Sequence, residues 1–354
     1  MAAIPLPRAT APAQARARGH GRSYSRRSSI LHITLITPAP RGSRAGNRAT
    51  AERWARLLRA SGHRTRIITE YDAEPTDLLV ALHAWRSSES VRQYRAHTPS
   101  GPLIVALTGT DIYRFQQTHP EATRYSMAEA DALIGLHERV ADDIPREFHN
   151  RLNTIFQSAE PLPSRRAPVQ SRFDVVVIGH LRDEKDSLRT AWAARQLPRE
   201  SRLNVIQLGR AHDDQWQALA EQEARENPRF DWKGELPRWQ VRRHMAKARL
   251  MVISSVMEGG ANVVSEACVA GLPVIASDIP GNVGLLGGDY PGTYPVEDTT
   301  ALREQLLRAE NEPEFLAALQ SRVEARAPLF RPEAEQAALE RVVNAVMDQY
   351  GKEN

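Results

Sequence analysis

The chain has 354 residues, of which 41% are hydrophobic and 25% charged, as in a globular protein large enough for two domains. No run of about 18 apolar residues occurs, so a membrane-spanning helix and stable membrane insertion are not expected. The formal net charge is +4 and the pI about 9.4, but acidic residues alternate with the arginines, so a nucleic-acid partner is not indicated. The single cysteine, Cys268, excludes an intrachain disulfide, fits a cytoplasmic location, and lies in an apolar stretch that predicts a buried side chain.

Residues 1–29 differ from the rest of the chain, because they contain six arginines and no acidic residue. This segment lacks the apolar region of a secretory signal, and its composition does not support a hydrophobic core. A transit-like leader and a basic arm are alternatives, and we expect a disordered basic extension.

A first α/β domain is expected at residues 30–160. An apolar run at 31–36 predicts a buried strand, and a turn-rich loop leads from it into a helix that ends before Gly62. Further strands are expected at 65–69, 78–82, 103–107, 132–136 and 153–156, with helix-compatible spacers between them. This alternation predicts a parallel sheet with helices on both faces.

A proline-rich segment at 161–170 predicts a linker, and a second domain is expected at 171–330. Its strands are predicted at 173–178, 203–208, 230–232, 250–253 and 274–276. The last segment, 331–354, has a helical pattern that we expect to pack back across the hinge. The predicted fold class is α/β, with two Rossmann-like doubly wound domains facing a cleft, where a ligand would bind.

The strongest candidate site is a glycine pair, Gly259 and Gly260, before a helix expected at 262–270. The free amides and the dipole of a helix N-terminus favour an anion, such as a diphosphate. Glu266, one turn into this helix, could accept hydrogen bonds from ribose hydroxyls, and Glu258 could reach a sugar or a leaving group. The alternative is a glycine turn flanked by two solvated glutamates.

A second candidate site is the segment 179–186, Gly-His-Leu-Arg-Asp-Glu-Lys-Asp, directly after an expected strand. Arg182 and Lys185 are three residues apart at the expected start of a helix, so both could face the cleft. Fixed cations there would stabilise the negative charge that develops on a diphosphate leaving group. The alternative is a surface helix start of mixed charge.

These two motifs, in this order and in a second α/β domain, resemble those of the retaining glycosyltransferases of family 4, which have the two-domain GT-B fold. The resemblance covers about residues 30 to 350. It implies a nucleotide-sugar-dependent hexosyltransferase without a metal cofactor. It assigns the family's glutamate pair to Glu258 and Glu266, its phosphate-binding pair to Arg182 and Lys185, and its glycine loop to 42–46.

One departure from the family pattern concerns residues 108–111, which read Thr-Gly-Thr-Asp where many members have His-Gly-x-Asp. The histidine of that pattern lies near the donor sugar, so the usual sugar contact is in doubt here. His83, at the end of an earlier strand, could replace it or could be a structural hydrogen-bonding group.

More narrowly, the segments 37–48, 82–88 and 107–113 resemble the selenosugar synthases of selenoneine biosynthesis. This resemblance implies a UDP-sugar donor (UDP-GlcNAc or UDP-glucose), a selenophosphate acceptor and a product with a carbon–selenium bond. Selenophosphate is an anionic, soft nucleophile, which needs cations and backbone amides rather than a strong base.

The expected site residues follow from these assignments. The catalytic residues are Glu258, Arg182 and Lys185, and the sugar donor is expected to bind Gly179, Glu258, Gly259, Gly260, Ala261, Asn262 and Glu266. The acceptor side is expected to comprise Gly42, Ser43, Arg44, Gly46, Asn47, His83, Arg86, Thr108 and Asp111. Alternatives are transfer to a hydroxyl of a cell-surface glycan or small metabolite, and a sugar-nucleotide-binding regulator without turnover. No metal site is expected, and the oligomeric state stays open.

Overall fold

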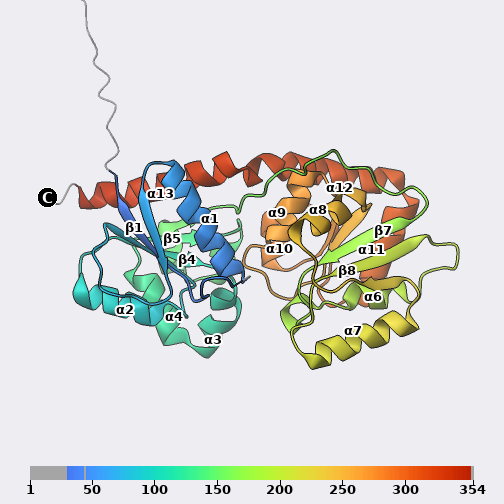
Figure 1. Ribbon diagram of the computed structural model, residues 1–354, viewed down its shortest axis with the longest axis horizontal. Helices are drawn as coiled ribbons and strands as arrows, with labels where there is room; N and C mark the ends of the chain where they lie inside the picture. Colours follow the sequence, from blue (N-terminus) through green and yellow to red (C-terminus); the bar gives the residue numbers. More distant parts are fainter. Residues whose placement is uncertain (1–29, 44, 352–354) are drawn as a thin grey trace, which may run out of the picture. The chain divides into compact units, whose positions relative to one another are not determined.

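The structure is a computed structural model that describes residues 30–43 and 45–351 (Figure 1). Of these, residues 31–43 and 45–351 belong to one compact unit. The expected basic extension, 1–29, and the acceptor-side residue Arg44 lie outside the described residues.

The first domain is built on a six-stranded parallel sheet with the strand order β2-β1-β3-β4-β5-β6. Its strands are β1 (His32–Ile36), β2 (Arg64–Ile68), β3 (Leu78–Leu82), β4 (Leu103–Leu107), β5 (Ala132–Gly135) and β6 (Leu152–Thr154). Every residue of β3 and β4 is buried, as expected for central strands covered on both faces.

Helices cover both faces of this sheet. They are α1 (Gly46–Ala60), α2 (Ser88–His97), α3 (Gln116–Thr118), α4 (Pro120–Glu129), α5 (Val140–Asp143) and α13 (Pro332–Tyr350). One face packs against α1 and α13, through buried side chains such as Trp54 and Leu339. The other face packs against α2 and α4, through Tyr94 and Met127. The C-terminal helix therefore completes the core of the first domain.

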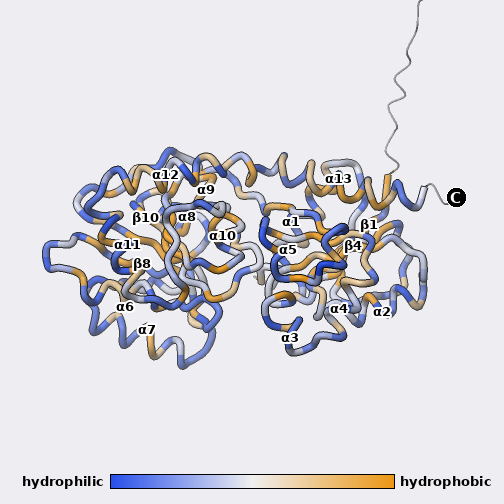
Figure 2. The backbone as a smooth tube through the Cα atoms, turned by 180° about the vertical axis from the view of Figure 1, so that it is seen from behind, coloured by the Kyte–Doolittle hydropathy of each residue, from blue (hydrophilic) through white to orange (hydrophobic). Residues whose placement is uncertain are grey.

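The second domain is built on another six-stranded parallel sheet, with the order β12-β11-β10-β7-β8-β9. Its strands are β7 (Phe173–Ile178), β8 (Leu203–Leu208), β9 (Phe230–Trp232), β10 (Leu250–Ile253), β11 (Val274–Ser277) and β12 (Thr293–Tyr294). Its helices are α6 (Arg189–Ala194), α7 (Asp214–Glu226), α8 (Arg238–Lys247), α9 (Asn262–Ala270), α10 (Pro280–Leu286), α11 (Thr299–Asn311) and α12 (Pro313–Arg326). Figure 2 shows the hydrophobic strands enclosed by helices of mixed polarity.

The predicted fold class is confirmed, since both sheets are parallel and flanked by helices. Cys268 is fully buried, as expected, and burial raises the pKa of its thiol to about 12. Among the described residues, no helix is both long and apolar enough to cross a membrane.

The structure corrects the prediction at one loop and contains two elements that the sequence analysis did not predict. Arg182 and Lys185 do not start a regular helix: residues Asp183–Lys185 form one 3-10 turn, and Asp186 takes a left-handed conformation (φ 44°) that ends it. The glycine-rich stretch after β11 contains a short helix, α10, which Pro280 starts. The strand β12 has only two residues, too few for a sequence pattern.

Candidate active site

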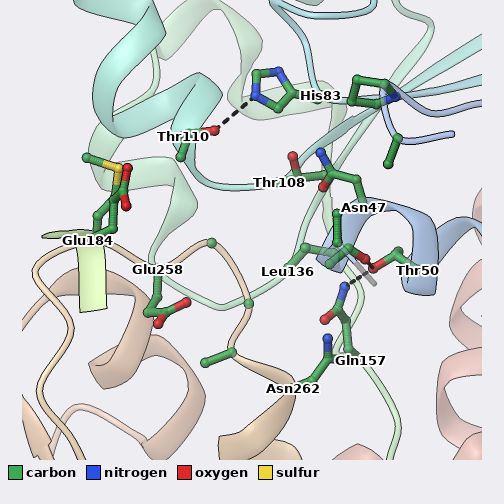
Figure 3. Close-up of a pocket in the computed structure, with 18 of the residues that line it drawn as sticks. Asn47, Thr50, His83, Thr108, Thr110, Leu136, Gln157, Glu184, Glu258 and Asn262 are labelled. Atoms are coloured by element: carbon green, nitrogen blue, oxygen red, sulfur yellow. Dashed lines mark hydrogen bonds between the residues drawn. The ribbon is translucent and has the colours of Figure 1, made fainter. Parts of the chain in front are cut away.

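A cavity of about 590 Å³ lies at the carboxyl ends of the strands, between residues of both domains (Figure 3). The residues of the first domain that line it include Ser43, Gly46, Asn47, Thr50, His83, Arg86, Thr108, Thr110 and Arg114. Those of the second domain include Arg182, Glu184, Lys185, Glu258, Gly259, Gly260, Ala261 and Asn262. We call it the main cavity.

Two helix N-termini reach the main cavity. Helix α1 contributes Gly46 and Asn47, and helix α9 contributes Asn262 and Val263. Neither helix has a side-chain cap or an acidic residue in its first turn. The first amides of a helix lack partners within the helix, and the helix dipole adds positive potential there, so both ends suit an anionic ligand.

The loop that precedes α9 contacts the loop after β4 and helix α10 at glycines. A Cβ atom on Gly259 would lie 2.2 Å from the carbonyl oxygen of Thr108, and one on Gly109 would lie 2.6 Å from the nitrogen of Gly259. Gly109 also has a φ of +119°, which side chains rarely allow. On the other side, a Cβ on Gly281 would lie 2.1 Å from the carbonyl oxygen of Glu258. The loop around Glu258 is therefore held between two main-chain surfaces.

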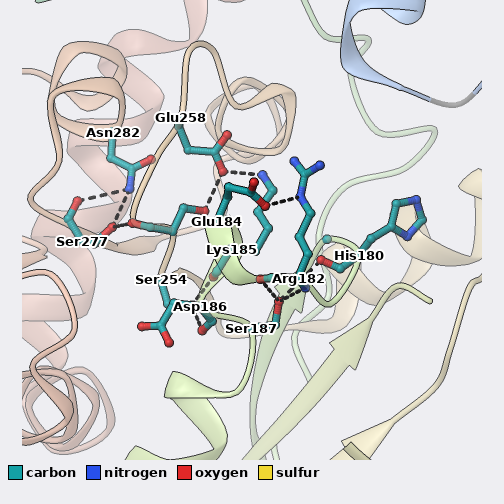
Figure 4. A network of polar contacts seen from close by, with 12 residues as sticks. His180, Arg182, Glu184, Lys185, Asp186, Ser187, Ser254, Glu258, Ser277 and Asn282 are labelled. Carbon is teal, nitrogen blue, oxygen red and sulfur yellow. Dashed lines mark hydrogen bonds and ion pairs between the residues drawn. The ribbon is translucent and has the colours of Figure 1, made fainter. Parts of the chain in front are cut away.

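The two motifs of the second domain meet at Glu258 (Figure 4). The Lys185 ammonium donates to the Glu258 Oε1 atom, and the Ser255 hydroxyl donates to the same oxygen at 2.6 Å. Glu258 is 9% exposed, and its pair with Lys185 joins the loop after β7 to the loop after β10. A bound anion at this point would face a lysine and a helix N-terminus together.

Glu184, which the sequence analysis did not select, lies between two arginines. Its carboxylate is 3.0 Å from Arg114 of the first domain and 3.7 Å from Arg182 of the second. Burial raises the pKa of Glu184, but its own backbone amide and both guanidinium groups outweigh burial and hold the pKa below the ordinary value. The carboxylate is therefore ionised at neutral pH.

His83 lines the main cavity, and its ring is held by two hydrogen bonds. The backbone N–H of Arg86 donates to Nδ1 at 3.2 Å, so Nε2 carries the proton of the neutral ring and donates to the Thr110 hydroxyl at 3.0 Å. Burial lowers the pKa of His83, although the Asp111 carboxylate opposes this. At pH values above this lowered pKa, the His83 ring is neutral and acts as a hydrogen-bonding group. Thr108 Oγ1 is buried beside it and has no partner among the described residues.

Asp111 does not line the main cavity, contrary to the sequence prediction. Its carboxylate is fully buried and accepts hydrogen bonds from the backbone N–H groups of Ala84, Thr108 and Gly109, at 2.7 to 3.0 Å. It therefore fixes the backbone of two loops whose other residues line the cavity. A carboxylate that satisfies several amides in this way is a structural group.

A second cavity, of about 720 Å³, adjoins the main cavity and shares Ala45, Gly46, Ile178, Arg182 and Lys185 with it. Its other lining residues are Gly179, His180, Leu208, Gly209, Glu235, Leu236, Pro237, Arg238 and Val241. The lining is mainly apolar, with backbone groups at two glycines. Sequence reasoning selected Gly179, Arg182 and Lys185 but missed the lining residues at 208–209 and 235–241, because these carry no recognisable motif.

Glu266 lies on α9 near the second cavity. Its carboxylate is 3.7 Å from Arg238, which lines that cavity, and its side chain is 23% exposed. Burial raises the pKa of Glu266, and the charges of Arg238, Arg242 and Arg53 offset part of this rise.

The expected site residues thus fall into three groups. Those brought to the main cavity are Arg182, Lys185, Glu258, Gly259, Gly260, Ala261, Asn262, Ser43, Gly46, Asn47, His83, Arg86 and Thr108. Gly179 lines the second cavity, while Gly42, Asp111 and Glu266 line neither. Among the described residues, no group of three or more His, Cys, Asp or Glu side chains could hold a metal ion.

Comparisons with known proteins agree with this architecture. Solved structures of the same fold include the sucrose-phosphate synthase of Thermosynechococcus elongatus, with a TM-score of 0.73 at 16% identity, covering 90% of this chain and 100% of that one. The Anabaena protein HepE in complex with UDP and glucose has a TM-score of 0.70 at 14% identity, covering 89% and 100%. A glycosyltransferase from Rickettsia africae has a TM-score of 0.71 at 10% identity, covering 90% and 99%. No curated protein sequence matches the chain.

The protein has the GT-B fold, which these glycosyltransferase structures share. Residues 162–326, which contain the whole second sheet, match the family model described as "Glycosyl transferases group 1". The second domain is therefore a group 1 glycosyltransferase domain, within a chain that has the fold of glycosyltransferase structures.

Proposed function

We propose that the protein transfers a sugar from a UDP-sugar, UDP-GlcNAc or UDP-glucose, to selenophosphate. The main support is a cavity in which two helix N-termini and four cations surround the space where an anionic sugar donor and an anionic acceptor would meet. HepE, which has the same fold, is described in complex with UDP and with UDP-glucose.

In this proposal the sugar donor occupies the second domain. The uracil enters the second cavity, where apolar side chains such as Leu208 and Leu236 suit a base. The ribose hydroxyls donate to Glu266. The diphosphate lies at the N-terminus of α9 and against Arg182 and Lys185, and the sugar lies beside Glu258.

The acceptor lies at the N-terminus of α1. Arg86 lines the main cavity there, lies 5.7 Å from the Trp85 ring, and has no carboxylate partner among the described residues. Trp85 in turn stacks on Phe115 with ring centroids 3.8 Å apart. This stacking holds the ring against which the Arg86 guanidinium lies. A guanidinium without a carboxylate partner, in the same cavity as a helix N-terminus, suits a small anion such as selenophosphate.

The transfer step breaks the bond between the anomeric carbon and the β-phosphate oxygen of the UDP-sugar. The selenium atom of selenophosphate supplies the electron pair of the new carbon–selenium bond, and UDP leaves with the electrons of the broken bond. Water then removes the phosphoryl group from selenium as phosphate, which leaves the selenosugar. Arg182, Lys185 and the α9 amides stabilise the charge on UDP, so we propose that no metal cofactor is required.

The test follows UDP release from UDP-GlcNAc and UDP-glucose, with selenophosphate, with alcohols or glycans, or with no acceptor. We expect release that depends on selenophosphate and persists in EDTA. We also expect Arg86→Ala to raise the KM for selenophosphate by about 10- to 100-fold, since one charged hydrogen bond contributes about 1.5–3 kcal/mol.

Arg92→Ala is the matched control, because Arg92 also stacks on an aromatic ring, Tyr125, but does not line the cavity. If UDP release requires a hydroxyl acceptor, the acceptor substrate is an alcohol and not selenophosphate. UDP binding without release under any condition would indicate a binding protein instead.

A further inference from the structure

Glu335, near the start of the C-terminal helix α13, holds three segments of the chain together. Its carboxylate is fully buried and accepts hydrogen bonds from Arg53 Nε at 3.0 Å and from Trp54 Nε1 at 2.8 Å, both on α1. The backbone N–H and the hydroxyl of Ser158 donate to its other oxygen at 2.8 and 2.5 Å. Ser158 lies where the chain leaves the first domain, and Glu335 lies where it returns.

Arg53 extends this network into the second domain. While its Nε atom is held by Glu335, its NH1 atom donates to Oδ1 of Asn262 at 3.2 Å. Asn262 is the first residue of α9, and Figure 3 shows it at the edge of the main cavity. The side chain of Arg53 is 12% exposed, so water screens this contact poorly.

The same arginine acts on the next turn of α9. Glu266 follows Asn262 by four residues and therefore lies on the same face of the helix. The positive charge of Arg53 lowers the pKa of Glu266, against the larger effect of burial. The NH2 atom of Arg53 is buried and has no hydrogen-bond partner among the described residues. Arg53 thus interacts with two α9 residues, Asn262 and Glu266, that the sequence analysis assigns to the sugar donor.

We propose that Glu335 and Arg53 are positioning residues, which fix the N-terminus of α9 relative to the N-terminus of α1. The expected effect on sugar transfer rests on the proposed function, in which the sugar donor binds at α9 and the acceptor at α1. The Glu335–Arg53–Asn262 chain sets the distance between the two reactants. Neither Arg53 nor Glu335 lines the main cavity, and each acts through Asn262.

The primary test compares Arg53→Ala and Arg53→Lys with Arg56→Ala. The lysine of Arg53→Lys keeps a charge for Glu335 but has no second nitrogen to reach Asn262. Arg56 is an exposed arginine on the same helix that does not line the cavity. We expect both Arg53 variants to lower kcat by about tenfold or more, since misplacing reactants by about 1 Å can cost about 100-fold.

A purely structural role and a positioning role are separated by two further measurements. The affinity for UDP, measured by calorimetry, should change less than threefold in the Arg53 variants, because UDP would bind the second domain. Amide hydrogen exchange in the first turn of α9 should speed up in the Arg53 variants and not in Arg56→Ala.

Each outcome decides the inference. Unchanged kcat or unchanged exchange at α9 in Arg53→Lys would overturn it, and so would a loss of UDP affinity as large as the loss of kcat. The exchange measurement needs no turnover. If the unchanged protein transfers no sugar but exchange at α9 depends on Arg53, the positioning contact stands and the proposed function fails.

Discussion

Both carboxylates that line the main cavity are paired with cations from another segment of the chain. Glu258 is bound by Lys185, and Glu184 lies between Arg114 and Arg182. These ion pairs keep the cations in fixed positions when no anion is bound. A diphosphate would take up the same cations with stronger charge-assisted hydrogen bonds.

A pH-dependent prediction follows from Glu266. Burial raises the pKa of its carboxyl above the usual value, and the charges of Arg238, Arg242 and Arg53 oppose that rise. The ionised form is the better acceptor for ribose hydroxyls, so UDP affinity should be full above this pKa. It should fall as the pH drops through the pKa, at a higher pH than for an ordinary glutamate.

Calorimetric titration of UDP between about pH 4 and pH 8 measures this effect. Arg238→Ala should move the fall in affinity to higher pH, because it removes the cation that most lowers the pKa. Glu266→Gln should abolish the acidic fall. The same midpoint with and without Arg238 would show that Glu266 does not control binding.

At the scale of elements, the glycine contact between the two loops gives the sharpest prediction. A methyl group at residue 259 would lie 2.2 Å from the Thr108 carbonyl oxygen, so Gly259→Ala should push the loops apart. We expect kcat to fall by about tenfold or more, while UDP still binds. Gly288→Ala is the control, because a Cβ there meets nothing within 4 Å. Equal kcat in the two variants would contradict a role for this contact.

The sequence predicted the elements best where residue patterns are local. The bounds of α9, its end at Gly271 and the strands β7, β8, β9 and β10 follow from apolar runs and glycine signals, and the structure has them at the predicted residues. The loop after β7 was predicted as a helix start, because its charges suit one. Its actual course depends on the left-handed Asp186, which pairs with Arg189.

Site residues that depend on contacts between distant segments could not be predicted in the same way. Asp111 was interpreted as an acceptor-side group, yet it accepts hydrogen bonds from amides of its own loop and from Ala84, 27 residues earlier in the chain. The pairing of Glu184 with Arg114 and of Glu335 with Arg53 joins positions 70 and 282 residues apart. No spacing in the sequence encodes these pairs, because each depends on how elements far apart in the chain pack together.

For the whole molecule, the chain passes between the domains twice, and both passages meet at Glu335. The first passage, near Ser158, and the return at α13 are tied to α1 by one buried carboxylate. Each domain presents one uncapped helix N-terminus to the main cavity. This arrangement brings a site for an anionic sugar donor next to a site for an anionic acceptor.

The most direct measurement of the central claim is the mass and connectivity of the product formed from UDP-GlcNAc or UDP-glucose and selenophosphate. Mass spectrometry and selenium NMR would follow a reaction that contains the protein, the UDP-sugar and selenophosphate. We predict UDP and a sugar whose anomeric carbon is bonded to selenium. Free sugar alone, or a sugar joined to oxygen, would contradict this account.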